Sequence, residues 1–222
     1  MRIDLLPDKF EGRHGRHYPA ALRRSMLDLA TTISDETARN RMIESLVESN
    51  DRHEALMRQL TYAHCWRSGE SESEAMWRIY GGAGASVALV LPYSRLRDSL
   101  ADKTLYIGRV NYFDYDKQIV GDANAYAPLM HKRLEFEHEQ EIRILKMDWS
   151  YAEGDPDQKE RWRARPDRPA VIAIPWPVAE HVESVIVSPY ASRWQADTIR
   201  EAVSRLAPGL EQRVINSRMG AD

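Results

Sequence analysis

Apolar residues recur at spacings of three and four along the chain from residue 19 to about residue 60. One such series begins at Leu22 and a second begins at Met42. This period places the apolar side chains on one face of an α-helix. Ser34 and Asp35 separate the two series and are residues that favour a helix N-cap. The pattern therefore predicts two helices, which together form a helical lobe over residues 19–60.

Beyond residue 60 the pattern changes to alternation and to short apolar runs, which are typical of β-strands. Strands are expected at residues 61–66, 86–91, 105–115, 139–147, 171–176 and 183–189, with a short one at 214–217. Helices are expected at residues 71–80, 124–133 and 191–206. Ser71 can cap the first of these, with Glu74 as its capping-box partner. Helices come first, and strands and helices follow without regular alternation. This order favours an α+β fold with a mixed, mainly antiparallel sheet and packed helices.

These elements fit a single domain that spans residues 1–222, because a chain of 222 residues suits one domain with an appended helical lobe. In this interpretation residues 61–222 form a mixed α/β core beside the lobe at residues 19–60. Residues 150–169 are polar and flanked by proline, so we expect them to form an excursion at the surface.

Composition narrows the functional classes. Hydrophobic residues make up 43% of the chain, which is enough for a core, and the 29% of charged residues nearly balance to a net charge of -3. Such a balance creates no global field that would recruit nucleic acid or acidic lipid. The single cysteine, Cys65, excludes an internal disulfide, and no apolar run approaches the roughly 20 residues that span a bilayer. We therefore expect a soluble, cytoplasmic protein with no membrane or nucleic-acid partner; a small-molecule ligand stays open.

Residues 132–145 read KRLEFEHEQEIRIL, and four glutamates occupy alternate positions, namely Glu135, Glu137, Glu139 and Glu141. In an extended strand these side chains share one face about 6.8 Å apart, and neighbouring carboxylates repel by roughly 2 kcal/mol at an effective dielectric constant of about 20. Two interpretations follow. The series is either an exposed edge neutralised by nearby basic residues, or Glu139 and Glu141 border a cleft beside Arg143. In the second case the carboxylates bind a ribose, act as a base or hold a metal.

A metal site is the least favoured of these options. His131 and His138 lie seven residues apart, and no nearby residue completes a recognised ligand set. The lone cysteine gives no metal-site spacing either. Cys65 beside His64 is not a nucleophile–base pair, because adjacent residues of a strand point to opposite faces.

A second stretch with candidate chemistry surrounds the helix expected at residues 71–80. Its aromatic residues Trp66, Trp77 and Tyr80 lie close in sequence to the polar residues His64, Arg67 and Ser68. This proximity lets aromatic walls and polar groups converge on a ligand. Aromatic residues at helical spacing belong more often to the core, however. Trp77 is therefore expected to pack in the core, and stacking on a ligand is its alternative role.

Several sequence boxes resemble a widespread bacterial domain family of unknown function. They are D-x-F-E-G at residues 8–12, C-W with E-S-E-A-M-W-x-x-Y at residues 65–80, I-G-x-V-x-Y at residues 107–112, K-R-x-x-F-E-H-E-Q-E-I-R at residues 132–143, and V-S-P with a following tryptophan at residues 187–194. The resemblance covers most of the chain. Because the family has no assigned activity, it implies no reaction.

A more distant resemblance does imply one. The acidic E-x-E box followed by an apolar residue, after a strand that bears an aromatic residue and a serine, is similar to the layout of ADP-ribosyltransferases. The resemblance implies that Glu141 grips the nicotinamide ribose of NAD and that Glu139 is the second acidic residue. The remaining NAD contacts would come from His64, Arg67, Ser68, Trp77, Tyr80 and Arg143. Those enzymes hold NAD with an Arg or His on an early strand, whereas this chain opens almost directly on the D-x-F-E-G loop.

Two functional classes thus remain: an NAD-using transferase, and a non-catalytic ligand- or protein-binding module, for example in stress or anti-phage defence. An enzyme needs Glu141 at a concave, partly buried site, whereas a module tolerates it on an exposed ridge. The catalytic interpretation predicts that Glu141→Gln leaves the melting temperature unchanged and abolishes an NAD-induced thermal shift. It predicts that Glu135→Gln abolishes neither that shift nor any activity of the parent.

Overall fold

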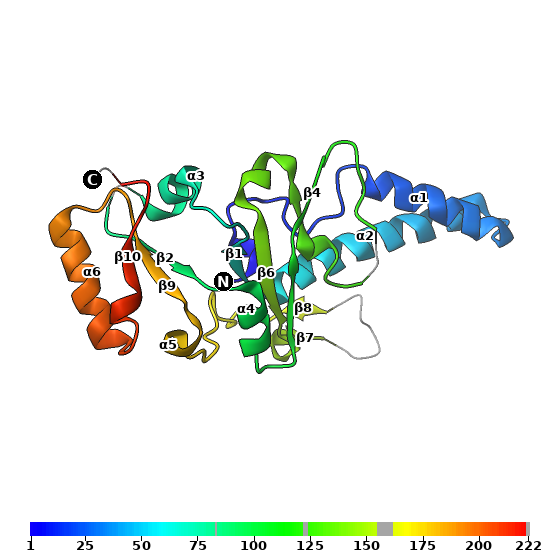
Figure 1. The fold of residues 1–222 in the computed structure, drawn as a ribbon. Helices are drawn as coiled ribbons and strands as arrows, with labels where there is room; N and C mark the ends of the chain where they lie inside the picture. Colours follow the sequence, from blue (N-terminus) through cyan, green and yellow to red (C-terminus); the bar gives the residue numbers. More distant parts are fainter. Residues whose placement is uncertain (83, 122–123, 155–161, 221–222) are drawn as a thin grey trace. The chain divides into compact units, whose positions relative to one another are not determined.

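The computed structural model describes residues 1–82, 84–121, 124–154 and 162–220 (Figure 1). Helices precede several small, mostly antiparallel sheets along the chain. The α+β class expected from the sequence is therefore confirmed. Two compact units form, one from Met1–Arg67 with Thr104–Ile172 and the other from Ser68–Lys103 with Ala173–Asp222.

The first unit begins with a helical hairpin, in which α1 and α2 lie side by side (Figure 1). Its elements are η1 (Ile3–Leu5), α1 (Tyr18–Leu29), η2 (Ala30–Thr32) and α2 (Glu36–Leu60). The carboxylate of Asp35 accepts hydrogen bonds from the backbone N–H groups of Thr37 and Ala38, at 2.8 and 3.1 Å. These bonds satisfy two donors that a helix start leaves unpaired, and so they begin α2 where the sequence predicts it.

A three-stranded antiparallel sheet carries the core of this unit, in the order β1–β6–β3. The strands are β1 (Thr61–Arg67), β6 (Glu141–Met147) and β3 (Leu105–Arg109). Leu145 of β6 lies opposite Ala63 of β1, and both pack with Ile3 in a buried cluster. Because side chains alternate between the two faces of a strand, Glu141 and Arg143 lie on the same face as Leu145. The strand thus brings two charged residues to the edge of the core.

Shorter elements surround this sheet. β4 (Asn111–Phe113) pairs in parallel with β5 (His131–Arg133), and β7 (Ala152–Glu153) pairs with β8 (Arg163–Ala164). The unit also has three 3-10 turns, namely η4 (Pro128–Met130), η5 (Leu134–Glu139) and η6 (Trp149–Tyr151). The turn η5 connects β5 to β6, so the strand expected at residues 139–147 begins only at Glu141.

The second unit contains a sheet in the order β10–β9–β2, made of β10 (Val214–Asn216), β9 (Ser184–Val187) and β2 (Val87–Val90). Its helical elements are α3 (Glu74–Met76), η3 (Trp77–Gly81), α4 (Tyr93–Ser99), α5 (Val178–His181), α6 (Arg193–Leu206) and η8 (Glu211–Arg213). Val182, Val185 and Leu210 form its buried cluster. No helix in the described part of the chain is long and apolar enough to cross a membrane.

Two expected elements are wrong. Residues 124–133 do not form a helix; they form turns, then η4 and β5. Pro128 lacks the backbone N–H that an interior helix position donates, and it stands instead at the start of η4. Residues 171–176 do not form a strand. Pro175 removes a donor that a sheet ladder needs, and Val171 remains 61% exposed.

The capping box expected at Ser71 is also wrong. The helix begins three residues after Ser71, at Glu74, and Ser73 is its N-cap, whose hydroxyl accepts from the N–H of Met76 at 3.4 Å. Glu74 therefore sits inside the first turn, where it pairs with Arg78 at 2.8 Å. Both serines satisfy the same capping preference, so the local pattern could not choose between them.

Replacing Trp77 with alanine is expected to destabilise the protein by about 3–5 kcal/mol, because truncating a buried aromatic side chain leaves a cavity. Trp77 is 7% exposed, and its indole N–H donates to Glu72 at 3.0 Å. Trp194 is 68% exposed and serves as the matched control, with little change expected on truncation. Urea unfolding followed by circular dichroism measures both variants. Equal stabilities of the two would contradict the core role of Trp77.

Candidate functional site

Five charged residues meet inside the first unit: Glu11, Lys132, Glu139, Glu141 and Arg143. None of them is more than 6% exposed. They come from three parts of the chain, namely the loop before α1, the segment from β5 through η5, and the start of β6. Fully buried charges are rare unless they are paired, so this buried charge cluster is the most unusual feature of the unit.

Lys132 occupies the centre of the three carboxylates. Its Nζ lies 2.6 Å from Glu139 Oε2, 3.0 Å from Glu141 Oε1 and 3.3 Å from Glu11 Oε1. The ring of Phe136 approaches the ammonium from another side, with its centroid 4.6 Å away. The ammonium therefore takes the place that a cation would need among these oxygens. Within the described residues no group of three or more His, Cys, Asp or Glu side chains is arranged to hold a metal ion.

Arg143 has no exposed surface, and all its nitrogens face protein oxygens. Its Nη2 and Nε donate to Glu141 Oε2 at 2.6 and 3.2 Å, and its Nη1 donates to the carbonyl of Leu129 at 2.6 Å. Its Nη2 also lies 3.0 Å from Glu11 Oε2. Arg143 was expected to contact a cofactor. In this arrangement each nitrogen of the guanidinium already contacts a protein oxygen, so Arg143 positions Glu141 and presents no donor at the surface.

The charges of the cluster balance only if one carboxyl group keeps its proton. Desolvation, together with the hydrogen bond to Glu141, raises the pKa of Glu139. Desolvation alone would also raise the pKa of Glu141. The positive charges of Arg143 and Lys132, together with a hydrogen bond to Glu139, outweigh desolvation and lower this pKa to about 2. These opposite shifts favour a proton on Glu139 rather than on Glu141.

The four glutamates do not share a face, contrary to the strand expectation. Glu135 and Glu137 are exposed, whereas Glu139 and Glu141 are buried. The reason is that residues 134–139 form the turn η5, and Gln140 then adopts a left-handed conformation with φ 45°. This reversal returns the chain to the sheet and directs the last two carboxylates to the same ammonium.

The D-x-F-E-G box supplies the rest of the cluster. Asp8 accepts from the N–H of Phe10 at 3.0 Å and pairs with Arg133 at 3.2 Å, and Glu11 reaches both buried cations. Gly12 has φ +76°, and a Cβ there would lie 2.8 Å from Arg58. This position therefore requires glycine. Sequence reasoning noticed this box only as a resemblance and missed Glu11 as a site residue.

Lys132 was also missed, since it was considered only as a basic neighbour of the glutamates. The sequence signal for both residues was the pairing of an acidic loop box with a K-R-x-x-F-E-H-E-Q-E-I-R box. Neither box alone says that its charges are buried. Glu11 and Lys132 become partners only when the loop before α1 packs against β5.

The other predicted site residues are not brought into the cluster. His64 is exposed on β1, and its neighbour Cys65 lies opposite Arg143 in the strand register. Cys65 also has exposed surface, yet its thiol is hydrogen bonded to Glu141. Desolvation, reinforced by the nearby carboxylates, raises the pKa of this thiol to about 12, so it is no nucleophile. Arg67 lies opposite Glu141 in the same register.

Ser68, Trp77 and Tyr80 belong to the second unit. Trp77 is buried, which confirms the core expectation, whereas Tyr80 is 64% exposed. An NAD site that combines these residues with Glu141 stays a prediction.

A pocket of about 300 Å³ lies next to the cluster, and it is called the Arg133 pocket below. It is lined by Phe10, Arg16 and residues 114–116 and 133–135. A second pocket of about 480 Å³ lies along α1 and α2. Neither is lined by Glu139, Glu141 or Arg143. Glu139, Glu141 and Arg143 are thus buried and lie outside both of these pockets, whereas Arg133 lines the first of them.

No protein-family model, curated protein or solved structure matches this chain. The likenesses to a bacterial family of unknown function and to ADP-ribosyltransferases therefore stay expectations. The role of the site has to be argued from its geometry.

We expect Glu139→Gln and Glu141→Gln to differ sharply in stability. Glutamine mimics the protonated Glu139, so that change should cost about 1 kcal/mol or less. Glutamine at position 141 removes the anion that pairs with Lys132 and Arg143, and breaking a buried pair in this way costs about 3–5 kcal/mol. Urea unfolding at neutral pH measures both free energies of unfolding. Equal losses would mean that the proton is not held by Glu139.

We expect the stability of the protein to fall at both ends of the pH range, in a lower limb due to Glu141 and an upper limb due to Glu139. The lowered pKa of Glu141 contributes stability that is present above 4.5, its ordinary value, and lost as the pH falls through about 2. The raised pKa of Glu139 contributes stability that is present below 4.5 and lost as the pH rises through its folded value. Melting temperatures across the pH range should show the upper limb in the parent and not in Glu139→Gln. An upper limb that persists in the variant would assign it to another group.

Proposed function

We propose that the chain is a non-catalytic module that binds a small polar ligand in the Arg133 pocket. The observation that carries this proposal is the state of Arg133 itself. Its Nε pairs with Asp8 at 3.2 Å, and its guanidinium lies over the rings of Phe10 and Phe136, at 4.8 and 5.3 Å from their centroids. The side chain is 28% exposed. Within the described residues, its two terminal nitrogens make no hydrogen bond, so held donors face the pocket.

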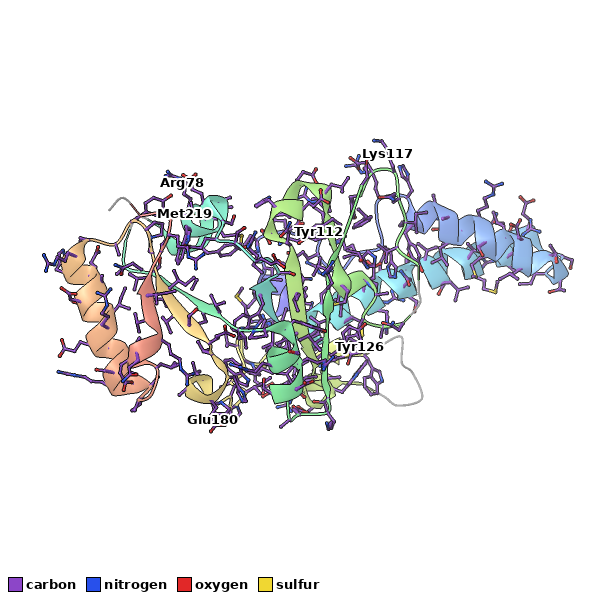
Figure 2. All side chains as sticks on the ribbon, in the orientation of Figure 1. Arg78, Tyr112, Lys117, Tyr126, Glu180 and Met219 are labelled. Atoms are coloured by element: carbon purple, nitrogen blue, oxygen red, sulfur yellow. The ribbon has the colours of Figure 1, made fainter. Side chains whose placement is uncertain are left out.

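The walls of the pocket are preorganised as well. The turn at residues 114–118 is tied to the loop before α1 by two backbone hydrogen bonds, from Arg16 to Tyr115 at 3.1 Å and from Val120 to His14 at 2.8 Å. Gly15 has φ +109°, and a Cβ there would lie 2.5 Å from the carbonyl oxygen of Gln118. Such close contact between two backbones limits the motion of the walls, which lowers the entropy cost of binding. Lys117, labelled in Figure 2, marks this turn.

The buried charge cluster fixes two of the chain segments that line this pocket. Lys132 and Arg133 are adjacent on β5, and side chains of adjacent strand residues point to opposite faces. Lys132 therefore enters the cluster while Arg133 enters the pocket. The D-x-F-E-G loop divides in the same way, with Glu11 in the cluster and Phe10 in the pocket wall. A cluster that fixes both segments is a scaffold for binding, since its own groups are buried and ion-paired with one another.

A second candidate function is the NAD-using transferase, and one observation favours it. Glu139 and Glu141 have pKa values shifted in opposite directions, and such pairs are typical of acid–base sites. For this function NAD would have to reach Glu141, which is 5% exposed and lines neither described pocket. The binding module needs no such opening, and it is therefore the better supported of the two.

A thermal-shift screen with small polar compounds, NAD and nucleotides tests both candidates. A ligand of the pocket should raise the melting temperature of the parent and of Arg24→Gln, an exposed arginine on α1, but not of Arg133→Lys. Lysine keeps the cation beside Asp8 but loses the planar fork that grips a ligand. A shift at a hundredfold excess over Kd corresponds to about 2.7 kcal/mol. Ligand shifts that survive in Arg133→Lys would contradict the pocket, and an NAD shift that Glu139→Gln abolishes would favour the transferase.

A further inference from the structure

We infer that the ligand of the Arg133 pocket is a zwitterionic α-amino acid with an apolar or aromatic side chain. This inference rests on the proposed binding function and adds the chemical class of the ligand. The ligand class follows from three features of the pocket: the charged residues that line it, the ion pairs that these residues already make, and the apolar side chains beside them.

The acidic residues of the pocket differ in whether they are paired. Asp114 lies 2.8 Å from Lys117 Nζ, and Asp116 lies 3.0 Å from Arg16 Nε. Glu135 is exposed and makes no hydrogen bond or ion pair within the described residues. One carboxylate of the lining is therefore left to receive a cation from a ligand.

The basic residues give the complementary result. Arg16 and Arg133 each contact an acidic partner through Nε, but the Arg16 side chain is 64% exposed to solvent, whereas the Arg133 side chain is 28% exposed and is held between aromatic rings. The terminal nitrogens of a guanidinium form a planar fork that matches the two oxygens of a carboxylate. The pocket therefore offers one site for a carboxylate, at Arg133, and one site for an ammonium group, at Glu135. A ligand that carries both groups and no net charge satisfies this pair.

The charge count disfavours phosphorylated ligands. Three carboxylates and two guanidinium groups line the pocket, and each guanidinium already has an acidic partner. A phosphate group with a charge near −2 would meet uncompensated repulsion from Glu135. Sugar hydroxyls or a nucleobase would leave the fork of Arg133 without an anion to bind.

The remaining lining is apolar and of limited size. Phe10 and Tyr115 are tilted against one another with ring centroids 4.7 Å apart, and Leu134 is 45% exposed. Desolvation raises the pKa of Tyr115, so its hydroxyl stays neutral. The volume of about 300 Å³ lies at the lower limit for ligand pockets, which suits a single amino acid better than a dinucleotide.

Calorimetric titration with L-leucine, L-phenylalanine and L-methionine tests the inference. At least one of them should bind the parent protein. Its N-acetyl derivative, which lacks the ammonium group, and its carboxamide, which lacks the carboxylate, should each bind at least tenfold more weakly. AMP, adenosine and inorganic phosphate serve as probes of the other ligand classes and should not bind.

The matched variants are Glu135→Gln and Glu137→Gln. Both residues are exposed members of η5, but only Glu135 lines the pocket. Glu135→Gln should keep the melting temperature and bring the affinities for the amino acid and its N-acetyl derivative close to each other, whereas Glu137→Gln should behave as the parent. Equal behaviour of the two variants would overturn the assignment of Glu135.

The outcomes separate this inference from the proposed function. If AMP, adenosine or phosphate binds in a manner that Arg133→Lys abolishes and the amino acids do not, the ligand class is wrong while the binding pocket stands. If neither these probes nor any compound of the thermal-shift screen binds in an Arg133-dependent manner, both the pocket and the ligand class are wrong.

Discussion

The burial of two cations, the ammonium of Lys132 and the guanidinium of Arg143, is the constraint on which the first unit depends. Each ion gives up hydration worth several kcal/mol when it leaves water, and only closely apposed acceptors can replace that hydration. Glu11, Glu139 and Glu141 provide it from three separate segments. The loop before α1, the turn η5 and the strand β6 must therefore pack together. If any one of them were displaced, a buried cation would lose an acidic partner.

The same constraint determines the register of β6. A shift by one residue would exchange Glu141 and Arg143 with Ile142 and Ile144, which lie on the other face of the strand. Lys132 would then lose its contact with Glu141, and Glu11 would lose its contact with Arg143. Hydrophobic contacts alone tolerate such slips more readily, because they are not directional. The ionic partners thus add specificity to a sheet whose stability comes from its apolar residues.

The buried charge cluster and the Arg133 pocket have different roles, which fall to neighbouring residues of the chain. Glu139 is paired with Lys132, Glu141 is paired with both cations, and both carboxylates are buried, so neither meets a solute from solvent. Arg133, one residue after Lys132, is fixed by Asp8 and still presents donors. Donors that are already held in place lose less conformational entropy on binding, and this raises the affinity for a ligand. A rigid ionic layer beneath a partly exposed arginine provides this preorganisation.

Local sequence patterns determined the parts of this protein that depend on neighbours along the chain. The apolar period and the capping preference of Asp35 predicted α1 and α2, and alternation predicted β1 and most of β6, because these signals act within a few residues. The same patterns singled out Glu139, Glu141 and Arg143. Only the tertiary structure decided that Glu139 lies in a turn, that Glu11 and Lys132 are its partners, and that Arg133 faces a pocket. Burial and ion pairing join residues from distant segments, and a local sequence pattern carries no information on which distant residues come into contact.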